Sequence, residues 1–258
     1  MKITLFDIGA FVGDVTDYFV KMFKELNIDY EVYQFEPYPP YVETLKSKAK
    51  NDSKIHVFQA AVSDDDGTTP LYMADIPAGH SLYSTKWNVD PNKSIDVDAI
   101  CFSSWYKKNF QRKKQADDFY IFKSNANGSE WDIFNDLIVS KLNSQMDVFC
   151  GKIFDNLKAN KTGAHTDKES KDFIAYLKKN GIDEIYLTGV NIDNLNVIRQ
   201  KILDFKQNLP KTDVAEQPSG PLEQIVLSPQ PPKPIVKEPR PKVRKQRPID
   251  GKTKEIER

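Results

Sequence analysis

The chain has 258 residues, of which 39% are hydrophobic and 11% aromatic, enough for the packed core of one large α/β domain or two small ones. Its 37 basic and 37 acidic residues balance, which excludes a general affinity of the whole chain for nucleic acid. No apolar run approaches the roughly 18 residues that span a bilayer, and Cys101 and Cys150 are too few for a disulfide framework. We therefore expect a soluble, cytoplasmic protein whose two cysteines are small buried hydrophobic residues.

The first three predicted elements are a strand, a helix and a second strand. Residues 3–7 form a short apolar run that ends in Asp7, Gly9 follows, and Gly13 comes four residues later. A helical stripe then begins at Val15, with Asp14 or Thr16 as its expected cap. A second strand, residues 31–35, leads directly into Glu36 and Pro37.

This order of residues is typical of a site for an adenosine-containing ligand. Glycines let the backbone approach the ligand, and the start of a helix offers free N–H groups. A carboxylate after the second strand can accept two hydrogen bonds from a ribose diol, and Glu36 stands at that position. Only Gly9 and Gly13 are present, however, and the Gly-x-Gly-x-x-Gly spacing of nicotinamide enzymes is not.

The middle of the chain predicts strands with one long loop. We expect a surface helix at residues 41–49 and a third strand at 55–61, followed by a turn at Asp64-Asp65-Asp66-Gly67 and the return strand of a hairpin at 69–73. Three adjacent aspartates beside a glycine favour a solvated turn over a metal site, so we predict no metal. Residues 74–94 have no clear period and are predicted to be a loop; a strand at 95–101 and a short helix through Trp105 follow.

The later elements continue the alternation. Residues 118–123 are a confident strand, and the apolar face of a helix follows at Trp131, Phe134, Leu137, Ile138 and Leu142. Two more strands are expected at residues 146–150 and 184–187, and two more helices around Phe173 and at residues 192–202. Such alternation over residues 1–205 predicts one domain with a doubly wound, mostly parallel, Rossmann-like α/β sheet that carries helices on both faces.

The composition changes after residue 205. Ten of the sixteen prolines lie at or beyond Pro210, and residues 231–258 hold ten basic and four acidic side chains, a net charge of +6. This composition buries too little apolar surface to offset the entropy of ordering the chain. We predict that residues 206–258 are a disordered, proline-rich basic tail, either a tether or a segment that docks on a proline-recognising protein partner. Nucleic acid is expected to bind weakly at most, because the tail has no aromatic residue for stacking.

With these segments placed, the chain resembles the FkbM-type S-adenosylmethionine-dependent methyltransferases. Five ordered pieces carry the resemblance over roughly residues 3–142: Phe6-Asp7-Ile8-Gly9-Ala10 with Gly13, Phe35-Glu36-Pro37, Ala60-Ala61-Val62-Ser63 with Gly67, Ser81-Leu82, and residues 123–130. The resemblance implies a class I methyltransferase fold with S-adenosylmethionine above the carboxyl ends of the strands. It implies that the cofactor contacts Asp7, Gly9, Ala10, Gly13, Glu36, Pro37 and Ala61, with Glu36 on the ribose and Ala61 on the adenine.

The acceptor side of this resemblance is altered. The family pattern favours Asp and Glu where this sequence has Asn125 and Asn127, and an amide cannot accept a proton as a general base. The remaining candidates for a catalytic role are Lys123, Glu130 and His80.

The resemblance implies transfer of a methyl group to a hydroxyl oxygen of a sugar or another small molecule. The alternative is a catalytically impaired relative that binds the cofactor and acts as a binding or scaffold module. A third, weaker hypothesis is a nicotinamide-dependent oxidoreductase on the same kind of sheet.

Overall fold

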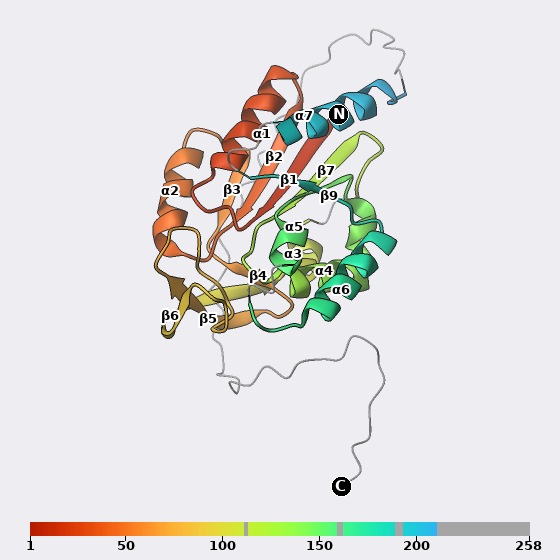
Figure 1. Cartoon of the computed structure of the whole chain (residues 1–258). Helices are drawn as coiled ribbons and strands as arrows, with labels where there is room; N and C mark the ends of the chain where they lie inside the picture. Colours follow the sequence, from red (N-terminus) through yellow and green to blue (C-terminus); the bar gives the residue numbers. More distant parts are fainter. Residues whose placement is uncertain (111–112, 159–161, 189–192, 211–258) are drawn as a thin grey trace. The chain divides into compact units, whose positions relative to one another are not determined.

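Six parallel strands form the central sheet of the computed structural model, which describes residues 1–110, 113–158, 162–188 and 193–210 (Figure 1). The order of these strands is β3-β2-β1-β7-β8-β9. Their bounds are Lys2–Ile8 for β1, Asp29–Phe35 for β2, Ile55–Phe58 for β3, Asp118–Ser124 for β7, Val148–Gly151 for β8 and Glu184–Tyr186 for β9. The predicted doubly wound parallel sheet is confirmed.

The strands of this sheet are connected mainly by helices. Their bounds are Asp14–Glu25 for α1, Pro39–Ala49 for α2, Phe102–Asn109 for α3, Glu130–Val139 for α4, Ile153–Lys158 for α5, Asp167–Lys179 for α6 and Asp193–Gln207 for α7, with a 3-10 turn η1 at Leu142–Gln145. Of these, α5 was not predicted from the sequence. Leu142 lies in η1 and not in the preceding helix, because Lys141 takes a left-handed conformation that ends it.

Side chains alternate between the two faces of the sheet, and each face has its own core. In β1, Ile3 and Leu5 pack with Phe19 and Phe23 of α1. The opposite face of β1 presents Phe6 and Ile8 to a second cluster built from α3, α4, α5 and α6. Helix α7 adds Ile198 and Ile202 to the core on the α1 side. Helices therefore cover both faces, as predicted.

A second, three-stranded sheet corrects the prediction for residues 55–73. The expected third strand is two strands, β3 in the main sheet and β4 (Ala61–Ser63) in the small one. Strand β5 (Gly67–Ala74) was expected to pair back on the third strand, but it pairs antiparallel with β6 (Val89–Cys101), which also pairs with β4. The continuous apolar pattern hid the break, because periodicity does not show which distant strand a residue pairs with. The predicted loop is correspondingly shorter and ends where β6 begins.

The expected cap of the first helix is also wrong. The N-cap residue of α1 is Gly13, with φ 86°, and no side chain caps the helix. The Thr16 hydroxyl instead donates a hydrogen bond to Asp7 Oδ2 at 2.6 Å. Both side chains are buried, so a strand-to-helix contact has taken precedence over a local cap.

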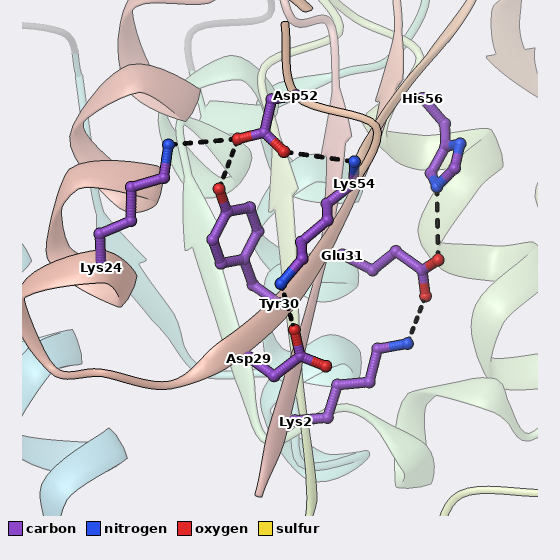
Figure 2. Close-up of polar contacts among 8 residues, drawn as sticks. All are labelled: Lys2, Lys24, Asp29, Tyr30, Glu31, Asp52, Lys54 and His56. Atoms are coloured by element: carbon purple, nitrogen blue, oxygen red, sulfur yellow. Dashed lines mark hydrogen bonds and ion pairs between the residues drawn. The ribbon is translucent and has the colours of Figure 1, made fainter. Parts of the chain in front are cut away.

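Charged residues near the amino ends of β1, β2 and β3 pair with one another (Figure 2). Glu31 accepts a hydrogen bond from Lys2 at 2.6 Å and lies 3.4 Å from His56 Nε2. These two neighbours, His56 first, lower the pKa of Glu31 to about 2. In the same group, Tyr30 and Lys24 contact Asp52, and Lys54 contacts both Asp29 and Asp52. The charged side chains drawn at this end of the sheet therefore satisfy one another.

Two further findings concern the chain as a whole. Cys101 and Cys150 are free and buried, as expected. Within the described residues, no helix combines the length and apolar character required to cross a membrane. The predictions for the basic tail, and the domain boundary at residues 205 and 206 that depends on them, are not tested, because residues 211–258 lie outside the described part.

Candidate functional site

A pocket lies at the carboxyl ends of the parallel strands, where β1 and β7 are neighbours and the order of the strands reverses. Open α/β sheets place their ligands at this switch point. The pocket has a volume of about 70 Å³ and is lined by residues that follow β1, β2 and β7 and by residues of the small sheet and its loop. Among the residues predicted from the sequence, the lining includes Gly9, Glu36, Pro37, Ala61, His80, Asn125 and Asn127.

The turn after β1 is a close fit that requires glycine. Gly9 has φ 69°, and a Cβ placed on it would lie 2.3 Å from the backbone oxygen of Asn125. The N–H groups of Gly9 and Ala10 both donate to Phe35 O, at 3.0 and 3.1 Å, which ties the turn to the end of β2. The backbone after β1 therefore contacts the end of β2 and the backbone after β7 directly. A side chain at position 9 would push these segments apart.

Glu36 holds the far end of the same turn. Its Oε2 accepts a hydrogen bond from Phe11 N at 2.9 Å, and its Oε1 accepts one from Tyr38 N at 3.0 Å. The side chain is buried, and burial raises its pKa to about 7 against the opposing effect of the two N–H groups. Each carboxylate oxygen keeps a second lone pair, so Glu36 retains acceptor capacity toward the pocket.

Asp7 and Lys123 form a buried ion pair beneath the glycine turn. They are direct neighbours in the register of β1 and β7 and point to the same face. Lys123 Nζ lies 2.7 Å from Asp7 Oδ1 and donates to Gly9 O at 2.7 Å. Neither residue lines the pocket. The contacts of Lys123 thus support the glycine turn, although the sequence placed it among the catalytic candidates.

Glu130 organises the loop that follows β7. Its Oε1 accepts hydrogen bonds from Ala126 N at 2.6 Å and Asn156 Nδ2 at 2.8 Å, and its Oε2 accepts one from Gly128 N at 2.8 Å. The side chain is fully buried and does not line the pocket. Asn156 also donates to Asn125 Oδ1 at 3.3 Å. Glu130 therefore shapes the loop that presents Asn125, and Asn156 was not anticipated because it lies in the unpredicted helix α5.

Asn127 and His80, both candidates for a catalytic role in the sequence, meet at the pocket. Asn127 Nδ2 donates to Ala78 O at 2.7 Å and to His80 O at 3.1 Å. The His80 ring accepts a hydrogen bond at Nδ1 from Ala74 N, at 3.0 Å. A neutral ring with an accepting Nδ1 carries its proton on Nε2, and burial together with Lys86 lowers the pKa of His80. His80 is therefore a hydrogen-bond donor in this pocket.

The opposite wall of the pocket is apolar. It is formed by Phe35, Ala60, Ala61, Val62 and Leu71. Ala60 precedes β4, and Ala61 and Val62 are its first two residues. The aromatic rings of Phe11 and Tyr41, whose centroids lie 4.5 Å apart, complete the rim. Phe11 was not singled out in the sequence; it has a left-handed backbone with φ 56°, for which a non-glycine residue gives no sequence signal.

Two sequence candidates of the cofactor side, Ala10 and Gly13, lie on the glycine turn and do not line the pocket. The Asp64-Asp65-Asp66 turn has a structural contact of its own, since Asp66 Oδ1 accepts a hydrogen bond from Cys101 N at 3.0 Å. Across the described residues, no group of three or more His, Cys, Asp or Glu side chains is arranged to hold a metal ion.

A parallel, doubly wound sheet with a pocket at its switch point defines the class of α/β proteins that hold their ligands above the strand ends. The sequence pattern of the Methyltransferase FkbM domain matches residues 7–181, which include every lining residue of the pocket and the sheet strands β2, β3, β7 and β8. The chain belongs to this family of methyltransferases.

Comparison with solved structures finds a crystal structure of Methyltransferase FkbM from Methylobacillus flagellatus KT. It is 12% identical in sequence, with a TM-score of 0.32, and the match covers 55% of the present chain and 31% of the other. The chain therefore corresponds to less than a third of that protein's length. A comparison with curated proteins gives no match.

Proposed function

We propose that this chain binds S-adenosylmethionine in the switch-point pocket and methylates a hydroxyl oxygen of a sugar or small molecule. The observation that carries the proposal is the position of Glu36, a buried carboxylate at the end of β2 that lines the same pocket as Gly9 and Ala61. A carboxylate there suits a ribose diol, and a glycine without Cβ suits close approach of a ligand to the backbone. The family membership supplies the reaction class.

The residues present fit this cofactor. Glu36 and Pro37 would hold the ribose side, the turn at Gly9 and Ala10 the amino-acid side, and Ala61 with its apolar neighbours the adenine. S-adenosylmethionine, when bound, supplies an electrophilic methyl group on a sulfonium. The chain contributes by binding and orienting the reactants in a site shielded from water, which is the main requirement of a displacement at carbon.

No strong base needs to be invoked on the acceptor side. Of the described lining residues, Glu36 is the sole carboxylate, and its two oxygens already accept hydrogen bonds from Phe11 N in the glycine turn and from Tyr38 N after β2. His80, protonated at Nε2, would donate a hydrogen bond to the acceptor or to the cofactor. Asn125 and Asn127 would orient the acceptor without taking its proton.

The direct test uses purified full-length protein, S-adenosylmethionine with a labelled methyl group and a panel of glycans and small hydroxylated molecules. Transfer of label to one acceptor class, with release of S-adenosylhomocysteine, is the expected result. The lack of a second lining carboxylate favours one other candidate, a relative that binds the cofactor without turning it over. Tight binding of S-adenosylmethionine with no transfer to any member of the panel would establish that candidate and contradict the enzyme.

The raised pKa of Glu36 predicts a pH-dependent affinity for S-adenosylhomocysteine. The pKa of about 7 leaves the carboxyl half protonated at neutral pH, and the ribose hydroxyls donate best to the ionised form. Affinity should rise about tenfold from pH 6 to pH 8, the change expected when only the ionised fraction binds. Isothermal titration calorimetry across this range measures it.

The raised pKa of Glu36 also makes the stability of the folded protein depend on pH. Because the folded pKa lies above the unfolded value of 4.5, the contribution of Glu36 to stability is complete below pH 4.5 and is lost as pH rises through about 7.

The matched control for the affinity measurement is Glu184→Gln, because Glu184 is a second acid whose pKa burial raises to about 7, and it does not line the pocket. That variant should keep the pH dependence of affinity, and Glu36→Gln should lose it. An affinity independent of pH in the wild-type protein would contradict the assignment of Glu36.

A further inference from the structure

One wall of the pocket in this structure is formed by the last residue of β5 and the loop that follows it. Residues 74–82, here called the cover, contribute Ala78, His80, Ser81 and Leu82 to the lining. The remaining volume of about 70 Å³ accommodates a few water molecules. Pockets for ligands of nucleoside size usually measure roughly 300–1,000 Å³, so a ligand of that size requires the cover to move.

Side chains from outside the cover hold its centre. The carbonyl oxygens of Ala78, Gly79 and His80 are consecutive, and each accepts a hydrogen bond from a side chain. Asn127 Nδ2 donates to the first and third, at 2.7 and 3.1 Å, and Lys86 Nζ donates to the second at 2.6 Å. At the base of the cover, Tyr72 and Ser81 form a single backbone bridge. The centre is therefore held by contacts that can be released without dismantling a sheet.

Asn127 sits on the fixed side of this contact. Its neighbours Ala126 and Gly128 are anchored by the buried Glu130 carboxylate, at 2.6 and 2.8 Å. Asn127 itself has φ 54°, a left-handed conformation that asparagine tolerates better than most residues. Its own carbonyl oxygen accepts a hydrogen bond from Ser81 Oγ at 2.8 Å. Asn127 thus forms hydrogen bonds with the cover through both its side chain and its backbone carbonyl oxygen.

Hydrogen-bond chemistry explains why residue 127 is an amide and not an acid. Carbonyl oxygens only accept hydrogen bonds, so the group that holds Ala78 O and His80 O must donate two. The NH₂ of asparagine does so, whereas a carboxylate would place negative charge against two carbonyl dipoles. The departure from the acidic residue expected at position 127 therefore matches the contacts that this residue makes.

We infer that Asn127 is a positioning residue whose hydrogen bonds with Ala78, His80 and Ser81, here called the latch, hold the cover over the pocket. Release of the latch admits the cofactor and the acceptor. The inference rests on the proposed function for the identity of the ligand. The latch itself does not depend on any ligand, because all its contacts are within the chain.

The test compares Asn127→Asp with the wild-type protein by hydrogen–deuterium exchange of the ligand-free chain. Aspartate keeps the size and the left-handed backbone but loses both donated hydrogen bonds, so amides of residues 72–82 should exchange roughly tenfold faster. The matched control is Asn143→Asp, because Asn143 Nδ2 also donates to a backbone carbonyl, that of Asn180 at 2.8 Å, away from the pocket. It should leave exchange of residues 72–82 unchanged. If Asn127→Asp does not fold, Ser81→Ala, which removes the hydrogen bond to Asn127 O, should give a smaller acceleration of the same segment.

The second readout is the association rate of S-adenosylhomocysteine, measured by surface plasmon resonance. Asn127→Asp should raise this rate in proportion to the faster exchange. Unchanged exchange of residues 72–82 in both pocket variants overturns the latch, and faster exchange with an unchanged association rate overturns its role in ligand entry. If the wild-type protein binds no S-adenosylhomocysteine, the proposed function fails, while the exchange comparison still decides whether Asn127 holds the cover.

Discussion

Replacing Lys123 by methionine is expected to lower the free energy of unfolding by about 3–5 kcal/mol, the usual cost of leaving one partner of a buried ion pair alone. Asp7 is fully buried, and Lys123 Nζ lies 2.7 Å from its Oδ1. The variant also removes the hydrogen bond to Gly9 O, so the glycine turn should loosen. Urea denaturation followed by circular dichroism measures the loss.

Two further variants separate the ion pair from other effects of the substitution. Lys2→Met breaks the more exposed pair with Glu31 and should cost less than about 1 kcal/mol. The double variant Asp7→Asn with Lys123→Met leaves no buried charge at this position and should be more stable than Lys123→Met alone. If Lys123→Met costs no more than Lys2→Met, the pair does not support the turn.

Glu36→Gln should weaken the binding of S-adenosylhomocysteine by roughly 1–3 kcal/mol, or about 5- to 150-fold in the dissociation constant. Two causes act together. The ribose diol loses a charged acceptor, and the amide has a single oxygen for the two N–H groups, of Phe11 and Tyr38, that the carboxylate satisfies in the native protein. One edge of the glycine turn is then left without its partner.

Isothermal titration calorimetry at pH 8, where the native carboxyl is mostly ionised, gives the clearest comparison. Thermal unfolding of both proteins without ligand shows how much of the change belongs to the turn alone. Glu184→Gln, which alters a half-buried acid outside the pocket, should bind as the wild-type protein does. A dissociation constant that does not change in Glu36→Gln would mean that the ribose lies elsewhere.

The main sheet could be predicted because its strands are marked locally. Residues 118–123 combine an apolar run with polar flanks, and residues 3–7 end in an acidic residue and a glycine. The small sheet could not be predicted in the same way, since β4 and β5 both pair with β6, with Ala61 opposite Ala99 and Ala74 opposite Val89. Local periodicity identifies a strand but carries no information about so distant a partner.

The candidate site, like the fold, could be predicted from the sequence only in part. Gly9, Glu36 and Ala61 line one pocket, and the sequence could suggest this because parallel strands bring their carboxyl ends to one edge of the sheet. Lys123 and Glu130 were recognised as unusual charges, but their contacts lie behind the pocket wall. Which partner a buried charge selects depends on distances of a few ångströms, and these follow from packing and not from spacing in the sequence.

Asn127 illustrates this limit most clearly. Its departure from an acidic residue pointed, in the sequence, to altered chemistry at the acceptor. In the structure its amide donates to Ala78 O and His80 O, which explains the residue by the closure of the pocket. The two accepting oxygens belong to backbone 49 and 47 residues away, and the sequence does not indicate that contact.

A crystal structure of the chain with S-adenosylhomocysteine would show whether the pocket at the ends of β1, β2 and β7 is the cofactor site. We expect the ribose hydroxyls within hydrogen-bonding distance of Glu36, the adenine against Ala61 and residues 74–82 moved outward from their present contacts. Ligand bound elsewhere, or bound here with the ribose away from Glu36, would contradict it.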